Sequence, residues 1–149
     1  MGTLIKKNFS FKESFDFNFL SNLLERNNFK SEITNNWLNQ MVLESVFKIE
    51  NVEKDTCFTE IFNLLNNNFN KLKKNSNLFI FFSLVSGVKS NAHRDDYDVF
   101  IIGLYGKTIY KVENEEFILE KGDLLSIKKN ELHKAISLTP RIILSYGIY

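Results

Sequence analysis

The feature that most limits the possible folds is a dense series of short β-type segments in the second half of the chain. About seven runs rich in β-branched and aromatic residues lie between Leu78 and Tyr149, separated by turns with Gly, Asn, Asp or Lys. They are FIFFSLV, DVFIIGLY, KTIYKV, EEFILE, DLLSI, HKAISL and RIILSYGIY. No stretch between them is long enough for the helix of a parallel crossover. This spacing predicts antiparallel sheets that close into a barrel or sandwich of the jelly-roll type.

The first half of the chain has a helical period instead. Apolar residues recur at helical spacing within 15–24 and again within 58–69, which predicts two amphipathic helices that pack on a sheet. The expected fold class is α+β, with N-terminal helices packed on a double-stranded β-helix (jelly-roll) barrel. A chain of 149 residues is most simply one domain, 1–149, with a mainly helical region over 1–77 and the barrel core over 78–149.

Composition gives no reason to expect a nucleic-acid or membrane partner. The formal net charge is +1, and 25% of the residues are charged. The longest apolar run, 78–88, is about half of the ~20 residues that a membrane-spanning helix needs. The single cysteine, Cys57, cannot form an internal disulfide, and the N-terminal residues lack the apolar segment of a secretion signal. We therefore expect a cytoplasmic protein.

The chain has only two histidines, and one of them lies two positions from an aspartate. In an extended strand, residues two apart point to the same face, so His93 and Asp95 can face one cavity while Arg94 points away. His133 follows a predicted strand and tight turn that can return the chain to the same place. Two histidines and one carboxylate form the facial triad of non-haem Fe(II) oxygenases. The sequence thus predicts a metal site of His93, Asp95 and His133.

The residues alone leave less specific interpretations open. A histidine is more often a core or surface residue than a ligand, and one His-x-Asp group is a weak signal. Asp96 lies on the opposite face of the predicted strand, and Asp98 is better placed for a turn or for a hydrogen bond to a metal ligand. Tyr97, Tyr105 and Tyr110 either line a pocket or pack in the core.

The spacing around both histidines resembles the two signature motifs of the cupin superfamily. In the first, five residues separate Gly87 from the HRD group at 93–95; in the second, GDLLSIKKNELH, ten residues separate Gly122 from His133. The Pro and Gly that are usual in the second motif are replaced by Lys128 and Asn130. Asn can still supply the left-handed turn.

Within the cupins, residues 78–148 resemble the JmjC-like 2-oxoglutarate oxygenases of the ribosomal-oxygenase type. The segments that carry this resemblance are NLFIFFSLVSG, HRDDYDVFIIGLYGKTIYKV, EKGDLLSIKKNELHKAIS and ILSYGI. The resemblance implies Fe(II) held by His93, Asp95 and His133, with 2-oxoglutarate and O2 completing the coordination sphere. It further implies hydroxylation of a peptide or protein side chain, or of a small amino-acid-like molecule.

The residue that anchors 2-oxoglutarate departs from the family pattern. Relatives use a Lys or Arg fifteen residues after the first histidine, and this chain has Thr108 there. Lys107 is adjacent, but strand alternation points it the other way. Arg141 opens the last predicted strand and resembles the Arg that many other 2-oxoglutarate oxygenases carry shortly after the second histidine. We expect Arg141 to bind the distal carboxylate, with Thr108 donating a hydrogen bond to the same group.

Two other functions remain open from the sequence. The first is a metal-dependent cupin that acts without 2-oxoglutarate, for example in a dioxygenation or an isomerisation. The second is a barrel without catalysis that serves as a ligand-binding or accessory module. The assembly is also open, with a homodimer as one alternative.

Overall fold

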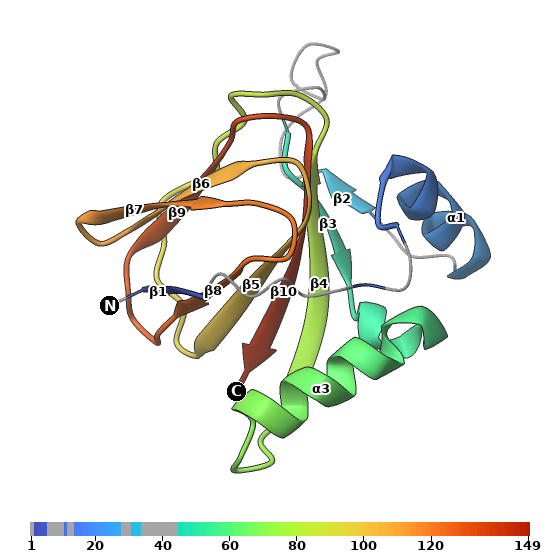
Figure 1. Ribbon diagram of the computed structural model, residues 1–149, viewed down its shortest axis with the longest axis horizontal. Coiled ribbons are helices and arrows are strands. Elements are labelled where there is room, and N and C mark those ends of the chain that lie inside the picture. The colour runs from blue at the N-terminus through green and yellow to red at the C-terminus, as the bar shows by residue number, and fades with distance from the viewer. Residues whose placement is uncertain (1, 6–10, 12–13, 28–30, 34–44) are drawn as a thin grey trace.

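The computed structural model describes residues 2–5, 11, 14–27, 31–33 and 45–149 (Figure 1). Over these residues, two helices and ten strands follow one another. In chain order they are β1 (Thr3–Ile5), α1 (Phe17–Asn27), β2 (Ser31–Ile33), β3 (Phe47–Glu50), α3 (Thr59–Phe69), β4 (Ser76–Ser83), β5 (Asp98–Tyr105), β6 (Thr108–Val112), β7 (Glu115–Leu119), β8 (Leu124–Ile127), β9 (His133–Ser137) and β10 (Arg141–Ile148). The seven strands predicted after residue 77 are confirmed as β4–β10.

The strands form one large and one small antiparallel sheet. The large sheet has the order β1-β8-β5-β10-β4-β3-β2, and the small sheet has the order β7-β6-β9. Figure 1 shows the small sheet folded over the side of the large sheet that contains β8, β5 and β10. The predicted antiparallel barrel-like architecture is therefore confirmed.

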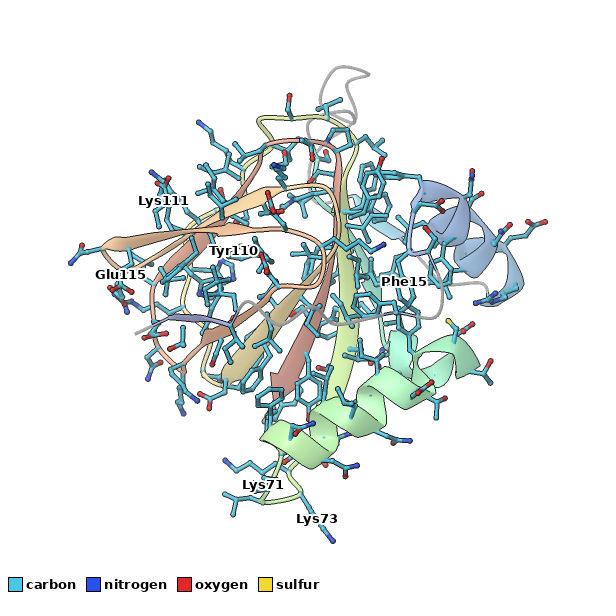
Figure 2. All side chains as sticks on the ribbon, viewed as in Figure 1. Phe15, Lys71, Lys73, Tyr110, Lys111 and Glu115 are labelled. Atoms are coloured by element: carbon cyan, nitrogen blue, oxygen red, sulfur yellow. The ribbon has the colours of Figure 1, made fainter. Side chains whose placement is uncertain are left out.

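One core fills the space between the two sheets. It combines side chains of the large sheet with side chains of the small sheet: Val99, Ile101, Leu125, Ile127, Ile143, Tyr110, Val112, Leu119 and Ala135. Strand β6 shows the alternation that builds this core, since Tyr110 points inward and Lys111 points to solvent (Figure 2). Each large apolar side chain buried in this way contributes about 1.5–3 kcal/mol.

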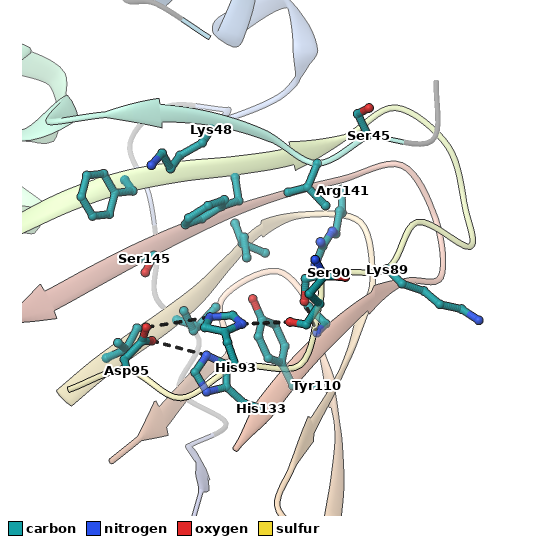
Figure 3. A pocket seen from close by; sticks show the side chains of 18 of the residues that line it. Ser45, Lys48, Lys89, Ser90, His93, Asp95, Tyr110, His133, Arg141 and Ser145 are labelled. Carbon is teal, nitrogen blue, oxygen red and sulfur yellow. Dashed lines mark hydrogen bonds and ion pairs between the residues drawn. The ribbon is translucent and has the colours of Figure 1, made fainter. Parts of the chain in front are cut away.

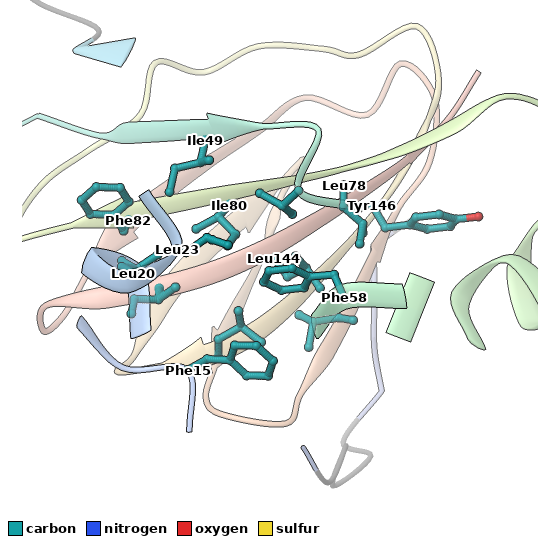
Figure 4. Packing of buried hydrophobic residues seen from close by; sticks show 14 of the residues in the cluster. Phe15, Leu20, Leu23, Ile49, Phe58, Leu78, Ile80, Phe82, Leu144 and Tyr146 are labelled. Atoms are coloured by element: carbon teal, nitrogen blue, oxygen red, sulfur yellow. The ribbon is translucent and has the colours of Figure 1, made fainter. Parts of the chain in front are cut away.

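A second core lies on the other face of the large sheet. The alternate residues of β4, Leu78, Ile80 and Phe82, pack there with Leu20 and Leu23 of α1 and with side chains around α3 (Figure 4). Both predicted helices are confirmed, as α1 and α3. Neither they nor any other described helix is long and apolar enough to cross a membrane.

The sequence did not predict the three short strands of the first half. β1 pairs with β8, β3 pairs with β4, and β2 pairs with β3, so all three extend the large sheet. β1 and β2 have three residues each and β3 has four. Such short segments contain too few alternations to show a period of two. The described residues before β4 are consequently less helical than expected.

Candidate metal centre

The segment that carries the first histidine runs beside strand β9. It connects β4 to β5 and makes two isolated bridges to β9, Lys89 to Ile136 and His93 to His133. His93 N–H donates to the His133 carbonyl at 3.0 Å, and His133 N–H donates back at 2.9 Å. The segment was expected to be a regular strand and is instead an extended connection. It still keeps the alternation of side chains on which the predicted site depends.

The structure brings His93, Asp95 and His133 together (Figure 3). One ligand atom of each lies within 4.8 Å of the others. Asp95 Oδ1 is 3.9 Å from His93 Nε2, and Asp95 Oδ2 is 3.5 Å from His133 Nε2. Small side-chain rotations would bring all three atoms to the bonding distance of about 2.1 Å from one ion. Two imidazoles and a carboxylate suit a divalent transition metal.

Backbone carbonyls fix the orientation of both imidazole rings. His93 Nδ1 lies 2.9 Å from the Asn91 carbonyl, and His133 Nδ1 lies 3.0 Å from the Glu131 carbonyl. A carbonyl only accepts, so each Nδ1 is the donor, and in the neutral ring each Nε2 keeps a lone pair on the side of Asp95. Partners of this kind hold metal-binding histidines in the tautomer that ligates.

The two histidines differ in exposure. The His93 side chain is 51% exposed, whereas that of His133 is 6% exposed. Burial lowers the pKa of His133, although the Glu131 carbonyl opposes this. A lowered pKa favours the neutral imidazole, the form that binds a metal. The site is thus anchored at His133 and open to solvent beside His93.

The neighbouring residues face elsewhere. Arg94 points away from the triad and donates to Glu113 Oε1 at 2.8 Å. Asp96 is exposed. Asp98 accepts from the Lys129 N–H at 2.9 Å and from Lys128 Nζ at 3.2 Å, and so binds the turn before His133.

The triad opens into a cavity of about 420 Å³ between the two sheets. This volume falls in the range of about 300–1,000 Å³ that is usual for small-molecule sites. Tyr97 and Tyr110 line the cavity, whereas Tyr105 lies outside it and is 43% exposed. The wall also contains the apolar side chains of Val99, Ile101 and Ile143.

Arg141 lies in the wall of this cavity and is 1% exposed. Its Nε donates to Ser83 Oγ at 3.2 Å, and its guanidinium lies near the Tyr110 hydroxyl. Nη1 is buried without a hydrogen-bond partner. Burial lowers the pKa of Arg141 and raises that of Tyr110 to about 12, so the phenol keeps its proton at neutral pH. A buried cation with an unused donor is suited to an anionic ligand.

The other two predicted anchor residues lie outside the cavity wall. Lys107 is 56% exposed at its side chain and pairs with Glu120 at 2.8 Å. Thr108 is buried on the same face of β6 as Tyr110, but it pairs with Ser137 deeper in the sheet and does not line the cavity. Of the three anchor residues, the structure brings only Arg141 to the cavity.

The cavity residues of β3 and β4 were not predicted from the sequence. Phe79, Phe81 and Lys48 line the cavity, and Ser83 supports Arg141. The alternation in FIFFS places Phe79, Phe81 and Ser83 on one face, which is a usable signal. The alternation alone does not show which of the two faces of β4 lines the cavity.

The two antiparallel sheets form a barrel-like fold with the triad at its mouth, and solved structures share this fold. Among solved structures, the chain aligns with YcfD, a ribosomal oxygenase from Escherichia coli, at a TM-score of 0.76 and 21% identity, over 99% of this chain and 47% of that chain. YcfD in complex with cobalt and succinic acid aligns at 0.76 and 20% identity, over 99% and 48% of the two chains. YcfD in complex with cobalt and 2-oxoglutarate aligns at 0.74 and 21% identity, over 100% and 48%.

The chain therefore spans about half the length of YcfD. No family model and no curated protein matches its sequence. A structural likeness at about 21% sequence identity shows a shared fold. It therefore confirms the fold that the resemblance of the sequence motifs implied.

Proposed function

We propose that the chain is an Fe(II)- and 2-oxoglutarate-dependent oxygenase that hydroxylates a peptide or protein side chain, or a small amino-acid-like molecule. The observation that carries this proposal is one cavity with two complementary ends. At one end, two histidines and a carboxylate face one another. At the other end, the buried Arg141 has an unused donor.

The donor set at the first end fits the metal. Two neutral imidazole nitrogens and one carboxylate leave coordination positions open for a cosubstrate and O2. His133 and Asp95 are held inside the barrel, whereas His93 lies at the solvent-facing side.

The distance between the two ends fits a five-carbon dicarboxylate. His133 and Ala135 are two residues apart on β9, and Tyr110 of β6 lies opposite Ala135. Two residues of a strand rise about 6.6–6.8 Å. Because the Arg141 guanidinium lies near Tyr110, we place the anchor about one such step along the barrel from the metal ligands. 2-Oxoglutarate bound to the metal through its keto-acid end would place its distal carboxylate near the guanidinium.

Each residue then has a defined task. Bound Fe(II), with 2-oxoglutarate and O2, supplies the oxidation that hydroxylates the substrate and releases succinate and CO2. His93, Asp95 and His133 hold and orient the ion. Arg141 binds the distal carboxylate through Nη1, and the nearby Tyr110 hydroxyl donates to the same carboxylate. Val99, Ile101 and Ile143 keep water from this side of the cavity.

Binding and turnover measured together test the proposal. The metal-free protein should bind one Mn(II) per chain and then N-oxalylglycine, an inert mimic of 2-oxoglutarate. With Fe(II) in air it should release succinate from 2-oxoglutarate, and His133→Ala should not. Metal binding without binding of the mimic would favour the cupin that acts without 2-oxoglutarate, and absence of metal binding would favour the non-catalytic barrel.

A further inference from the structure

Strand β10 lines the cavity with alternate residues from Arg141 to Ser145. Four residues of a strand span about 13 Å, twice the step that separates the metal ligands from Arg141. The end of β10 pairs with the start of β5, and Asp95 lies just before that start. Figure 3 accordingly shows Ser145 toward the end of the cavity with Asp95 and Arg141 toward the other end. A cosubstrate that reaches from the metal to Arg141 would therefore leave Ser145 free.

The Ser145 hydroxyl is buried without a hydrogen-bond partner. Ser145 is 6% exposed, and its side chain makes no hydrogen bond with the part of the chain that the structure describes. The other buried polar residues of the cavity wall are used: His133 faces the metal, Arg141 faces the cosubstrate, and Ser45 has further interactions. A buried hydroxyl that lacks a partner costs free energy, which a ligand that bonds it recovers. Ser145 thus marks a place where a ligand offers a hydrogen bond.

The surface beside this hydroxyl is aromatic and neutral. Phe79 of β4 lies directly opposite Ser145, and Phe81 follows one step along the same face. Both rings are half-buried and line the cavity, with centroids 6.4 Å apart. The ammonium group of Lys48 lies 5.6 Å from the centre of the Phe79 ring, but its charge is matched by Glu50. Among the described residues, this surface offers a ligand two rings and one hydroxyl, without an unmatched charge.

We propose that Ser145 binds the substrate, and that the substrate inserts a neutral side chain with an apolar body and one hydrogen-bonding group. The apolar body would lie on Phe79 and Phe81, and the Ser145 hydroxyl would bond the polar atom as donor or acceptor. A charged group would lose its hydration there without gaining a partner. A side chain without a polar atom would leave the hydroxyl unsatisfied. This inference rests on the proposed function, because it assumes that metal and 2-oxoglutarate occupy the rest of the cavity.

Matched peptides test the proposal. The protein is loaded with Mn(II) and N-oxalylglycine and titrated in a calorimeter with peptides Ac-Gly-Xaa-Gly-NH2. Xaa forms three pairs of similar shape, Asn with Leu, Gln with Met, and Tyr with Phe. In the pair that binds most tightly, the polar member should bind about threefold to tenfold more tightly than its apolar partner, as one neutral hydrogen bond requires. Asp and Glu, which have the shapes of Asn and Gln, should bind more weakly than those amides.

Two serine variants assign the effect to one hydroxyl. Ser145→Ala should abolish the preference for the polar member and leave the affinity for its apolar partner unchanged or higher. Ser126→Ala is the control, because Ser126 is also buried in the large sheet but does not line the cavity, and it should keep the full preference. A thermal melt of the metal-free protein adds a second measurement. Because the Ser145 hydroxyl has no partner, Ser145→Ala should melt no lower than wild type.

Several results would overturn the inference: equal affinity within every pair, tightest binding of a charged peptide, no binding of any peptide, or a preference that Ser145→Ala keeps. A lower melting temperature of Ser145→Ala would show that the fold itself uses the hydroxyl, and a lower affinity of this variant for N-oxalylglycine would assign the hydroxyl to the cosubstrate. In each case the binding of Mn(II) and N-oxalylglycine by the wild type, measured beforehand, leaves the proposed function in place. Failure of the wild type to bind Mn(II) would instead remove the proposed function and this inference with it.

Discussion

His93 and His133 form a backbone pair with two hydrogen bonds, at 3.0 and 2.9 Å, and their ring centroids are 4.3 Å apart. Both imidazole side chains therefore extend from directly paired positions on two adjacent antiparallel segments. Such pairs fix the separation of side chains more firmly than a flexible loop does. The pairing of β9 with the 87–97 segment thus sets the geometry of the candidate metal centre before any ion binds.

Removing the buried histidine should abolish the metal site. A site with three protein ligands has no spare ligand, so His133→Ala should weaken Mn(II) binding by about 100-fold or more. Calorimetric titration of the metal-free protein measures this directly. Lys134→Ala, on the neighbouring position of β9 that faces the other way, is the control. Equal affinity of wild type and His133→Ala would exclude His133 from the site.

The three neighbouring aspartates should differ sharply. Asp95 shares the face of His93, Asp96 is exposed, and Asp98 binds the turn at Lys129. We expect Asp95→Ala to lose Mn(II) binding, Asp96→Ala to keep it, and Asp98→Ala to lower it only modestly through the turn. The same titration checks all three variants. Loss of the metal in Asp96→Ala alone would place the ligands one residue away from where the structure has them.

The sequence predicted those features that depend on local alternation. The strands from β4 onward are mostly five to eight residues long and show their period clearly. The shared face of His93 and Asp95 was predicted correctly even though the segment is not a regular strand, because one bridge to β9 suffices to keep it extended there.

Features that depend on pairing between distant segments could not be predicted in the same way. Thr108 was expected to reach the cosubstrate, and its face on β6 agrees with Tyr110. How far Thr108 lies from the metal ligands, however, follows from the register of β6 with β9. In that register Thr108 lies opposite Ser137, four residues beyond His133. Likewise, only the pairing of β4 with β3 and β10 shows that Phe79 and Phe81 face the cavity. No local pattern contains a register of this kind.

Arg141 should hold the distal carboxylate of 2-oxoglutarate. A hydrogen bond between charged partners is worth roughly 1.5–3 kcal/mol, so Arg141→Met should lower the affinity for 2-oxoglutarate by about tenfold or more. Lys107→Ala and Thr108→Val should leave it nearly unchanged, because neither side chain lines the cavity. Titration of the Mn(II)-loaded protein measures these affinities.

A thermal melt separates this effect from damage to the fold. The buried guanidinium has an unpartnered Nη1, and removing a buried cation that lacks an anionic partner costs little. The melting temperature of metal-free Arg141→Met should therefore stay within about 4 °C of wild type. Binding of 2-oxoglutarate by this variant with wild-type affinity would rule Arg141 out as the anchor.

Arg94 should position the metal ligands from outside the cavity. It lies between His93 and Asp95 in the chain, and its Nη1 donates both to Glu113 Oε1 and to the Asn130 carbonyl. Glu113 Oε1 also accepts from the Leu132 N–H at 2.7 Å, and the Asn130 N–H donates to the Asp95 carbonyl at 2.8 Å. These bonds tie the segment with His93 and Asp95 to the turn that leads into His133.

The turn itself shows why such a tie is needed. Asn130 in this turn has a φ of 66°, the left-handed conformation that the sequence motif predicted for it, and its neighbour across the Arg94 bonds, Glu113 in the turn between β6 and β7, has a φ of 50°. Side chains other than Gly adopt this region at some cost and are held there by their surroundings. Loss of the Arg94 side chain would let the turn relax and move His133 relative to Asp95.

We therefore expect Arg94→Ala to lower the Mn(II) affinity by about tenfold, as is typical when a partner that orients metal ligands is removed. The thermal stability of the metal-free protein should change little, because both members of the Arg94–Glu113 pair are about half exposed and such pairs contribute little to folding. The exchanged pair Arg94→Glu with Glu113→Arg should recover some of the affinity, and Lys107→Ala, which breaks an equally exposed pair with Glu120, should have no effect. A fall in stability without a fall in metal affinity would show that Arg94 supports the fold and does not position the ligands.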